Sequence, residues 1–294
     1  MIFLAGVRNP EGPVSLPDGS WIFTEMDAGC ISHVSANGQA LQEIVKTGRP
    51  NGLALDKSGN IWVAEAKNRS LLMVTTEGKI ITISKGNTSF NFLLPNDLCI
   101  GPDKAIYMTD SGILRDELHG IYKPMDAYDL SFNGHIFRVD PKTNSCTCFD
   151  EGIRLTNGIA FDPTGEYLYV AETITGNIYR YRFGIGKDQV LGSRELFGNV
   201  MAKPPQEFGR IAGPDGMAFD VKGNLYVTVL AQGDITVLDA NGKVKKRIQL
   251  EGNLPTNLAF NQNGKPFIIV TEASRGELLL IETEYPGCSL YNII

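Results

Sequence analysis

The chain has little of what marks membrane proteins and nucleic-acid-binding proteins. Its 294 residues contain no apolar run that approaches the roughly 18 residues needed for a membrane span. The stretch Met1–Val7 has no basic residue and is too short for a secretory leader, so we expect a β-strand there. A formal net charge of −6 lacks the basic excess typical of nucleic-acid binders. We therefore expect a small-molecule partner, with no nucleic acid and no membrane. The oligomeric state does not follow from the sequence.

Cysteine is scarce and odd in number. The five cysteines are Cys30, Cys99, Cys146, Cys148 and Cys288. An odd count in a long chain without a leader predicts free thiols in a reducing compartment, so we expect a cytoplasmic protein. Cys146 and Cys148 would share one face of a strand. Without a second pair they indicate small buried side chains rather than a zinc site.

Several well-known catalytic motifs are missing. There is no Gly-x-Ser-x-Gly elbow, no phosphate-binding P-loop and no His-Glu-x-x-His pair. The three histidines, His33, His119 and His135, have no strong nucleophile beside them in the sequence. The chemistry must therefore come from another arrangement of side chains.

What the chain does contain is a short motif repeated six times. Each copy begins with a turn-forming or small residue, which is followed by a polar residue. In most copies a glycine comes next, and an apolar strand then begins. The copies are Pro10–Val14, Pro50–Ala54, Pro95–Cys99, Thr156–Ala160, Pro214–Ala218 and Pro255–Ala259. Their polar residues follow one another at steps of 40, 45, 61, 58 and 41 residues. Strand-rich repeats of this length are typical of a β-propeller.

The second repeat shows the expected unit most clearly. It contains four short apolar segments separated by turn residues, at Leu53–Asp56, Ile61–Glu65, Ser70–Val74 and Lys79–Ile83. Such a pattern predicts a four-stranded antiparallel meander. Six of them make an all-β, six-bladed propeller that occupies residues 1–294 as a single domain. We expect Ile2–Val7 to complete the last blade, because this would remove an exposed sheet edge.

The repeat places one polar residue at the same point of every blade. In chain order these are Glu11, Asn51, Asn96, Asn157, Asp215 and Thr256. A ring of carboxylate and amide oxygens suits a hard divalent cation, Ca²⁺ first or Mg²⁺. Mn²⁺, Zn²⁺ and Fe²⁺ are alternatives with weaker selectivity. The competing interpretation is that the ring bonds only to backbone and water in the channel.

A second set of acids ends the second strand of most repeats. These are Glu25, Glu65, Asp110, Glu172 and Glu272. They could form an outer acidic ring, or they could accept hydrogen bonds from the backbone of the next turn. Asp110 opens a long insertion, which makes it a candidate substrate-binding residue as well.

Two insertions, residues 111–133 and 184–211, interrupt the spacing of the repeats. Long loops on a compact scaffold are often lids or binding loops. The first follows a strand that returns to the ring end, so we expect it to cover that end of the channel. Its apolar groups are Ile113, Leu114, Leu118, Tyr122, Met125, Tyr128 and Phe132, and they are accompanied by Arg115, Asp116 and His119. This mixture favours a partly hydrophobic substrate over a sugar. The alternative is a loop that only packs on the neighbouring blade.

Three of the motifs resemble one known family. Glu11-Gly12-Pro13, Asn157-Gly158 and Pro214-Asp215-Gly216-Met217, with a tail over 287–291, are similar to the senescence marker protein / gluconolactonase / luciferin-regenerating enzyme family. The resemblance implies a propeller with one catalytic divalent cation held by Glu11, Asn157 and Asp215. It also implies that Asp215 is the general base. Asn96 matches a position that contacts the substrate or a cation-bound water.

The resemblance implies a metal-dependent hydrolase that opens a lactone, either a sugar lactone or a more hydrophobic cyclic ester. Asn96 and Asn51 would then orient the ester or the attacking water. Leu94 stands where sugar lactonases often have arginine, and the insertion after Asp110 is similar to drug-responsive lactonases and strictosidine-synthase-like proteins. The alternative from another class is a non-hydrolytic propeller, either a calcium-binding regulatory protein or a lyase, isomerase or condensing enzyme that uses the same channel.

Overall fold

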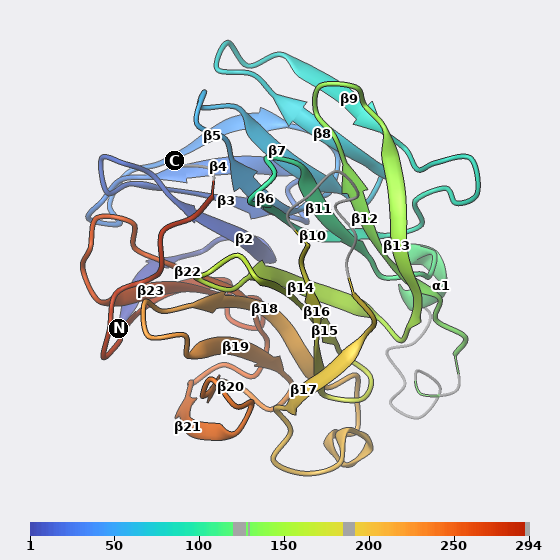
Figure 1. Cartoon of the computed structure of the whole chain (residues 1–294). Helices are drawn as coiled ribbons and strands as arrows, with labels where there is room; N and C mark the ends of the chain where they lie inside the picture. Colours follow the sequence, from blue (N-terminus) through green and yellow to red (C-terminus); the bar gives the residue numbers. More distant parts are fainter. Residues whose placement is uncertain (120–127, 129, 185–191, 292–294) are drawn as a thin grey trace.

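The computed structural model describes residues 1–119, 128, 130–184 and 192–291. It contains six four-stranded antiparallel sheets arranged around a central channel (Figure 1), so the prediction of a six-bladed propeller is confirmed. The first blade consists of β2 (Pro10–Ser15), β3 (Trp21–Glu25), β4 (Cys30–Val34) and β5 (Leu41–Lys46). The second consists of β6 (Pro50–Leu55), β7 (Ile61–Glu65), β8 (Ser70–Val74) and β9 (Ile80–Ser84). The third consists of β10 (Pro95–Ile100), β11 (Ile106–Asp110), β12 (Gly134–Val139) and β13 (Cys146–Ile153).

The remaining blades follow the same plan. They are β14 (Thr156–Phe161), β15 (Tyr167–Glu172), β16 (Asn177–Arg182) and β17 (Glu195–Asn199); β18 (Gly213–Phe219), β19 (Leu225–Leu230), β20 (Asp234–Leu238) and β21 (Val244–Gln249); and β22 (Pro255–Phe260), β23 (Phe267–Glu272), β24 (Glu277–Glu282) and β1 (Ile2–Ala5). A short helix α1 (Arg115–His119) and a 3₁₀ turn η2 (Pro205–Phe208) lie in the two insertions.

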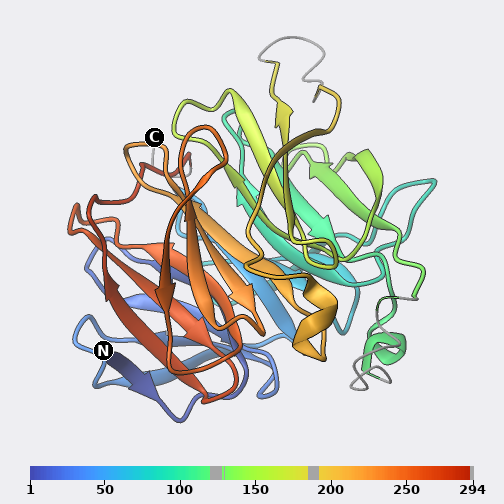
Figure 2. The same cartoon turned by 90° about the horizontal axis from the view of Figure 1, so that it is seen from below.

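The ring is closed by the two ends of the chain. β1 pairs with β24 in antiparallel register, with Leu4 opposite Leu278. The N-terminal strand thus completes the sixth blade, as the sequence predicts, and covers the outer edge of β24. Figure 2 gives the view turned by 90°, in which β1 lies beside the last strands of the chain.

The hydrophobic core lies between the blades. Six clusters of buried side chains each join one blade to its neighbour, and one of them, with Trp21 and Phe23 against Ile269, joins the last blade to the first. Both faces of each inner strand are therefore buried, which explains the continuous apolar runs in the sequence. Packing between blades fixes the position of every inner strand, and so of the residue with which it begins.

Two smaller expectations can be compared with the structure. The five cysteines are unpaired, as expected for free thiols. Among the described residues, no helix is long and apolar enough to cross a membrane. The cytoplasmic location itself stays a prediction.

Candidate functional site

A cavity of about 540 Å³ lies at one end of the channel. All six residues of the predicted ring line it: Glu11, Asn51, Asn96, Asn157, Asp215 and Thr256. Five of them are nearly buried, and Asn96 is half-buried. Residues spread over most of the chain thus converge because each begins the inner strand of a different blade (Figure 1).

A β-bulge sits at this point in every blade. The pairing of each inner strand with its neighbour shifts register at the ring position or just after it, for example between Glu11 and Val14 in the first blade. A bulge bends the strand and changes the direction in which a side chain points. The repeated bulge explains how a polar side chain can face the channel at the start of an otherwise apolar strand.

The two acids of the ring repel each other. Burial raises the pKa of Glu11 to about 8, with the charge of Asp97 adding to the effect. Burial also raises the pKa of Asp215 well above its ordinary value, and the charges of Glu11 and Asp97 raise it further. A site that assembles carboxylates in this way favours binding of positive charge.

The side chain of Asn157 also favours a bound cation. Its Nδ2 donates to Thr173 Oγ1 over 3.2 Å, whereas its Oδ1 is buried and has no hydrogen-bond partner among the described residues. A buried amide oxygen without a partner is destabilising unless a ligand satisfies it. Together with the carboxylates of Glu11 and Asp215, it forms an all-oxygen set of the kind that hard divalent cations prefer. These residues therefore fit the cation that the sequence analysis expects.

The other ring residues differ in how they are held. Asn96 Nδ2 donates to Ser111 Oγ over 3.0 Å, which leaves its carbonyl oxygen for the cavity. Thr256 donates to the backbone oxygen of Pro10 over 2.8 Å, so it ties the sixth blade to the first. No described residue bonds the Asn51 side chain. Among the described residues no group of three or more His, Cys, Asp or Glu side chains is placed to hold a metal ion, so amide ligands are essential to the proposed site.

Two polar side chains in the throat of the channel were not predicted from the sequence. Asn257 Nδ2 donates to Glu11 Oε2 over 3.0 Å and lies 3.4 Å from Asp97 Oδ2. Burial raises the pKa of Asp97 to about 6. Asp97 and Asn257 stand directly after a ring residue, where the other four blades have glycine. The replacement of glycine in these two copies is the sequence feature that could have identified Asp97 and Asn257.

Two of the glycines at this position, Gly52 and Gly216, make room for those two side chains. A Cβ on Gly52 would lie 2.3 Å from Asp97 Oδ1, and one on Gly216 would lie 2.0 Å from Asn257 Oδ1. Neither glycine has a positive φ, so space and not backbone conformation requires it. The Asn-Gly and Asp-Gly pairs of the motif are therefore packing features of the channel as well as turn signals.

The outer acids accept hydrogen bonds from backbone N–H groups. Glu65 accepts hydrogen bonds from the backbone N–H groups of Arg49, Lys67 and Asn68. Glu272 accepts from the N–H groups of Leu254 and Arg275 over 2.8 and 2.7 Å. Glu25 and Glu172 likewise accept the N–H that precedes their own inner strand, from Arg8 and Arg154. The backbone alternative is thus the one that the structure supports.

Asp110 belongs to this outer set. Its carboxylate accepts the N–H groups of Leu93 and Leu94 over 2.8 and 3.0 Å and that of Gly112 over 2.9 Å. It is fully buried and does not line the cavity. The expected substrate contact of Asp110 is therefore not supported, because all of its near donors belong to the backbone that it holds in place.

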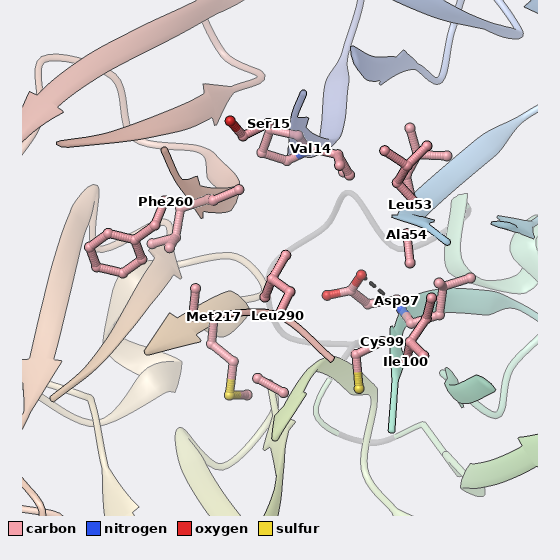
Figure 3. Close-up of a pocket in the computed structure, with 18 of the residues that line it drawn as sticks. Val14, Ser15, Leu53, Ala54, Asp97, Cys99, Ile100, Met217, Phe260 and Leu290 are labelled. Carbon is pink, nitrogen blue, oxygen red and sulfur yellow. Dashed lines mark hydrogen bonds between the residues drawn. The ribbon is translucent and has the colours of Figure 1, made fainter. Parts of the chain in front are cut away.

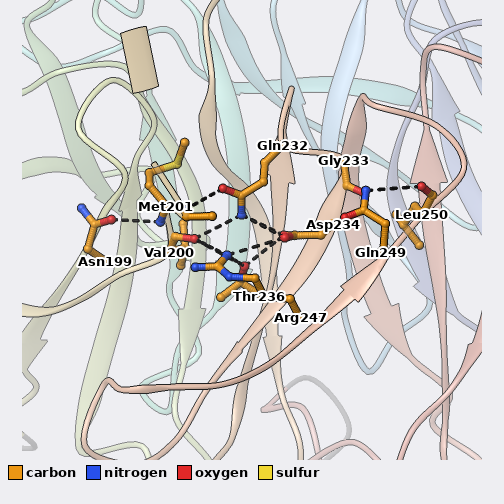
Figure 4. A network of polar contacts seen from close by, with 11 residues as sticks. Asn199, Val200, Met201, Gln232, Gly233, Asp234, Thr236, Arg247, Gln249 and Leu250 are labelled. Atoms are coloured by element: carbon orange, nitrogen blue, oxygen red, sulfur yellow. Dashed lines mark hydrogen bonds and ion pairs between the residues drawn. The ribbon is translucent and has the colours of Figure 1, made fainter. Parts of the chain in front are cut away.

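The fifth blade uses a different acid. β19 ends without a carboxylate, and the acid beside its end, Asp234 at the start of β20, accepts from the side chains of Gln232 and Thr236 instead of from backbone N–H groups. Figure 4 shows Asp234 between Gln232, which donates to it over 2.9 Å, and Arg247, whose Nη1 lies 3.6 Å away. Arg247 also donates to the backbone oxygen of Val200 over 2.6 Å. This network ties the fourth blade to the fifth and lies outside the cavity lining.

Both insertions reach the ring end of the channel. Ser111 and Arg115 of the first and 209–211 of the second line the cavity. Tyr128 Oη donates to the backbone oxygen of Arg210 over 3.3 Å and so connects them. Ile113 and Phe132 are buried in a cluster with Leu94 and Leu155 and do not line the cavity, which corrects the expected use of these two. Residues 120–127 and 129 lie outside the described residues, as do the side chains of 118 and 119.

The opposite mouth of the channel holds a smaller hollow of about 130 Å³. Figure 3 shows Leu290 of the C-terminal tail among the inner strands there, near Asp97 and Met217. Tyr291 Oη donates to the backbone oxygen of Asp162 over 2.9 Å. The tail therefore narrows this mouth, and the larger cavity at the ring end is the more open route to the ring residues.

Comparisons with known proteins show the family and agree with the fold. A family model described as "SMP-30/Gluconolactonase/LRE-like region" matches residues 9–274. A gluconolactonase of Zymomonas mobilis is 25% identical over 288 residues, which cover 91% of this chain and 77% of that protein. The structure of a Xanthomonas campestris gluconolactonase has a TM-score of 0.77 at 20% identity, with 96% of this chain and 88% of that chain covered. A calcium-binding regucalcin of Agrobacterium tumefaciens has a TM-score of 0.76 at 17% identity, with 99% of each chain covered. These two likenesses in structure concern the fold.

Proposed function

We propose that this chain, which belongs to the SMP-30/gluconolactonase/LRE-like family, hydrolyses a lactone with the help of one divalent cation. The observation that carries the proposal is the cavity in which Glu11, Asn157 and Asp215 meet while Asn157 Oδ1 has no partner among the described residues. Lactonase activity follows from the family and from the gluconolactonase relative. The dependence on a cation and the roles of the residues are our proposal. Ca²⁺ is the first candidate, because the donors are all oxygens and a neighbour in structure is a calcium-binding protein.

The cation, held by Glu11, Asn157 and Asp215, would act as a Lewis acid towards the lactone carbonyl. Asn51 would donate a hydrogen bond to the ester, because its amide lines the cavity and no described residue bonds it. Asn96 would accept a hydrogen bond from the attacking water through the oxygen that its bond to Ser111 leaves unused. Both amides would thereby fix the approach of the water to the carbonyl carbon.

Asp215 is the proposed base. Glu11 Oε2 already accepts from Gly12 N and from Asn257 Nδ2, and the other ionisable residues that line the described cavity are arginines. Asp215 would take one proton of the water as its oxygen bonds to the carbonyl carbon. When the bond between the carbonyl carbon and the ring oxygen breaks, that proton would pass to the leaving oxygen. The product is a hydroxy acid, so the reaction is balanced with water as the only co-substrate.

The walls above the ring suggest which lactones fit. Met26, Leu94, Leu155, Leu230 and Leu254 all line the cavity. Apolar walls leave sugar hydroxyl groups without partners, so we propose a cyclic ester with a partly apolar body.

The proposal is tested by acid release from a panel of aliphatic and sugar lactones, followed with a pH indicator. The protein is assayed after EDTA treatment and again after addition of Ca²⁺, Mg²⁺, Mn²⁺, Zn²⁺ or Fe²⁺. We expect activity that EDTA abolishes and one cation restores. Unchanged activity in EDTA would refute the role of the cation. Absence of acid release with every lactone and cation would favour the non-hydrolytic alternative.

A further inference from the structure

The upper wall of the large cavity carries positive charge. Above the ring, every blade contributes to the lining, and the ionisable side chains there are Arg49, Arg115 and Arg210. Among the described lining residues the only carboxylates are Glu11 and Asp215, which belong to the ring below. The whole chain has a net charge of −6, so this concentration of arginine is a local feature and not a consequence of composition.

Within the part of the chain that the structure describes, Arg49 is the only one of the three arginines that forms an ion pair. Arg49 Nη1 donates to Asp27 Oδ1 over 2.5 Å at the edge of the cavity. Among the described residues Arg115 Nε is buried without a hydrogen-bond partner, and neither Arg115 nor Arg210 forms an ion pair. The acid nearest in effect to Arg115 is Asp27, whose pKa the charge of Arg115 lowers, but Asp27 is the ion-pair partner of Arg49. A guanidinium group that is partly removed from water and lacks a partner is destabilising unless a ligand supplies the missing acceptor.

Both unpaired arginines are placed by anchored backbone. Arg115 follows Ile113, which is 4% exposed in the cluster beneath the first insertion. Arg210 precedes Ile211, which packs on the same cluster, and its backbone oxygen accepts from Tyr128. The two side chains come from different insertions, one after the third blade's second strand and one before the fifth blade's first strand. They therefore approach the cavity from two sides.

We propose, on the basis of the lactonase function proposed above, that the substrate is a lactone with an anionic substituent that Arg115 and Arg210 bind. Carboxylate, sulfate and phosphate groups share the required chemistry, because each offers several acceptor oxygens to the planar fork of a guanidinium. The lactone ring would lie at the oxygen ring below, and the anionic substituent would point to the mouth. The apolar wall between the two would hold the body of the substrate and leave few places for neutral hydroxyl groups.

The electrostatics of the cavity support this orientation. With a divalent cation bound between Glu11 and Asp215, the charges of the ring are roughly balanced, and the arginines dominate the potential at the mouth. An anion is then attracted to the mouth, and the neutral ester group is left for the site of reaction. An anion bound directly to the cation would instead place a carboxylate where the ester must react. The arginines would thus orient the bound substrate as well as increase its affinity for the cavity.

The experiment compares two ligands that differ only in charge. One is γ-butyrolactone with a carboxylate on the ring carbon next to the ring oxygen, and the other is the corresponding primary amide. Hydrolysis of both is measured with Ca²⁺-loaded wild type, Arg115→Met, Arg210→Met and the double variant. Arg182→Met is the matched control, because Arg182 is exposed, lies in β16 and is absent from the cavity lining.

We expect wild type to prefer the carboxylate in kcat/KM by about 10-fold to 100-fold, which is the range for loss of a charge-assisted hydrogen bond. Each single variant should lose most of this preference through a higher KM, while hydrolysis of the amide changes by less than about 3-fold. High salt should weaken the preference of wild type. The control should keep it. No preference in wild type, or equal losses on both ligands in the arginine variants, would overturn the inference and leave the lactonase function standing.

A separate measurement keeps the inference testable if neither lactone is hydrolysed. Calorimetry would then compare binding of the hydroxy dicarboxylate that ring opening produces with binding of its monoamide, in the Ca²⁺-loaded protein. Tighter binding of the dicarboxylate that Arg115→Met and Arg210→Met remove would support the anion site even though the lactonase proposal had failed. Equal binding of both compounds in all variants would overturn the anion site as well.

Discussion

Glu11→Gln should stabilise the cation-free protein while it weakens cation binding. In the cation-free protein, burial and the charge of Asp97 raise the pKa of Glu11 from 4.5 to about 8. The folded protein therefore holds a proton on Glu11 that the unfolded chain releases in neutral solution. Glutamine removes this titration. Its amide oxygen can still accept the bonds that Glu11 Oε2 receives from Gly12 N and Asn257 Nδ2.

The size of the effect depends on pH in a defined direction. Below the unfolded pKa of 4.5 both states are protonated, so Glu11 adds no penalty there. Between 4.5 and about 8 the folded state binds more protons than the unfolded state, so its stability falls as pH rises. The penalty is on the order of 3 kcal/mol at neutral pH and about 5 kcal/mol above the folded pKa, at about 1.4 kcal/mol for each pH unit. The variant should be more stable than wild type by these amounts.

Urea unfolding in EDTA at several pH values, and again with saturating Ca²⁺, measures both parts of the prediction. Calcium should stabilise wild type strongly and the variant weakly, since ligands that bind only the folded state add stability. Glu65→Gln is the control. The Glu65 carboxylate accepts three backbone N–H groups, so this variant should be less stable than wild type. The reasoning is refuted if the variant is no more stable than wild type in EDTA above the folded pKa, or if both gain equally from calcium.

The remaining predictions concern other parts of the site. Asp215→Ala should lower kcat/KM by about 10³-fold or more while the fold survives, and Asn96→Ala should lower it by about 10-fold to 100-fold; steady-state kinetics with circular dichroism would show this, and small equal losses would contradict the assigned roles. Asp110→Ala should cost about 3 kcal/mol or more of stability, because it leaves three buried N–H groups unpaired. The kcat/KM of the molecules that remain folded should stay within about 3-fold of wild type, and a larger fall would indicate that Asp110 contacts the substrate. Gly52→Ala should cost about 1–3 kcal/mol in urea unfolding, because its methyl group would lie 2.3 Å from Asp97 Oδ1, and an unchanged midpoint would contradict the packing argument.

Repetition made the fold and the ring predictable. One copy of the motif is a weak turn signal, but six copies at a blade-sized period fix the number of blades and place one polar residue per blade at the channel. The cavity lining contains all six predicted residues because the packing between blades positions every inner strand alike. In the second blade β7 and β8 have the predicted boundaries, whereas β6 begins at Pro50 instead of Leu53 and β9 lies one residue later than predicted.

The residues that sequence reasoning missed are those for which repetition carries no information. Asp97 and Asn257 break the pattern of the motif, and a glycine in the other copies reads as a turn until its neighbour's side chain is placed beside it. Arg115 and Arg210 lie in insertions that occur once each, so no second copy marks their position. Their meeting at the cavity depends on the path of two loops, which the local sequence does not determine.

The acids of the channel region separate into two classes by the donors within their reach. Glu65 and Asp110 each face three backbone N–H groups, which satisfy a buried carboxylate without any cation. Glu11, Asp97 and Asp215 instead share few donors, and one of these, Asn257 Nδ2, serves both Glu11 and Asp97. Their charges raise one another's pKa or add to the effect of burial. Composition alone does not separate these classes, because both consist of Asp and Glu residues. One class lies near the start of the first strand of a blade and the other at the end of the second strand. The supply of N–H groups separates them: where the backbone satisfies the carboxylate it acts as scaffold, and where it does not, the site requires positive charge.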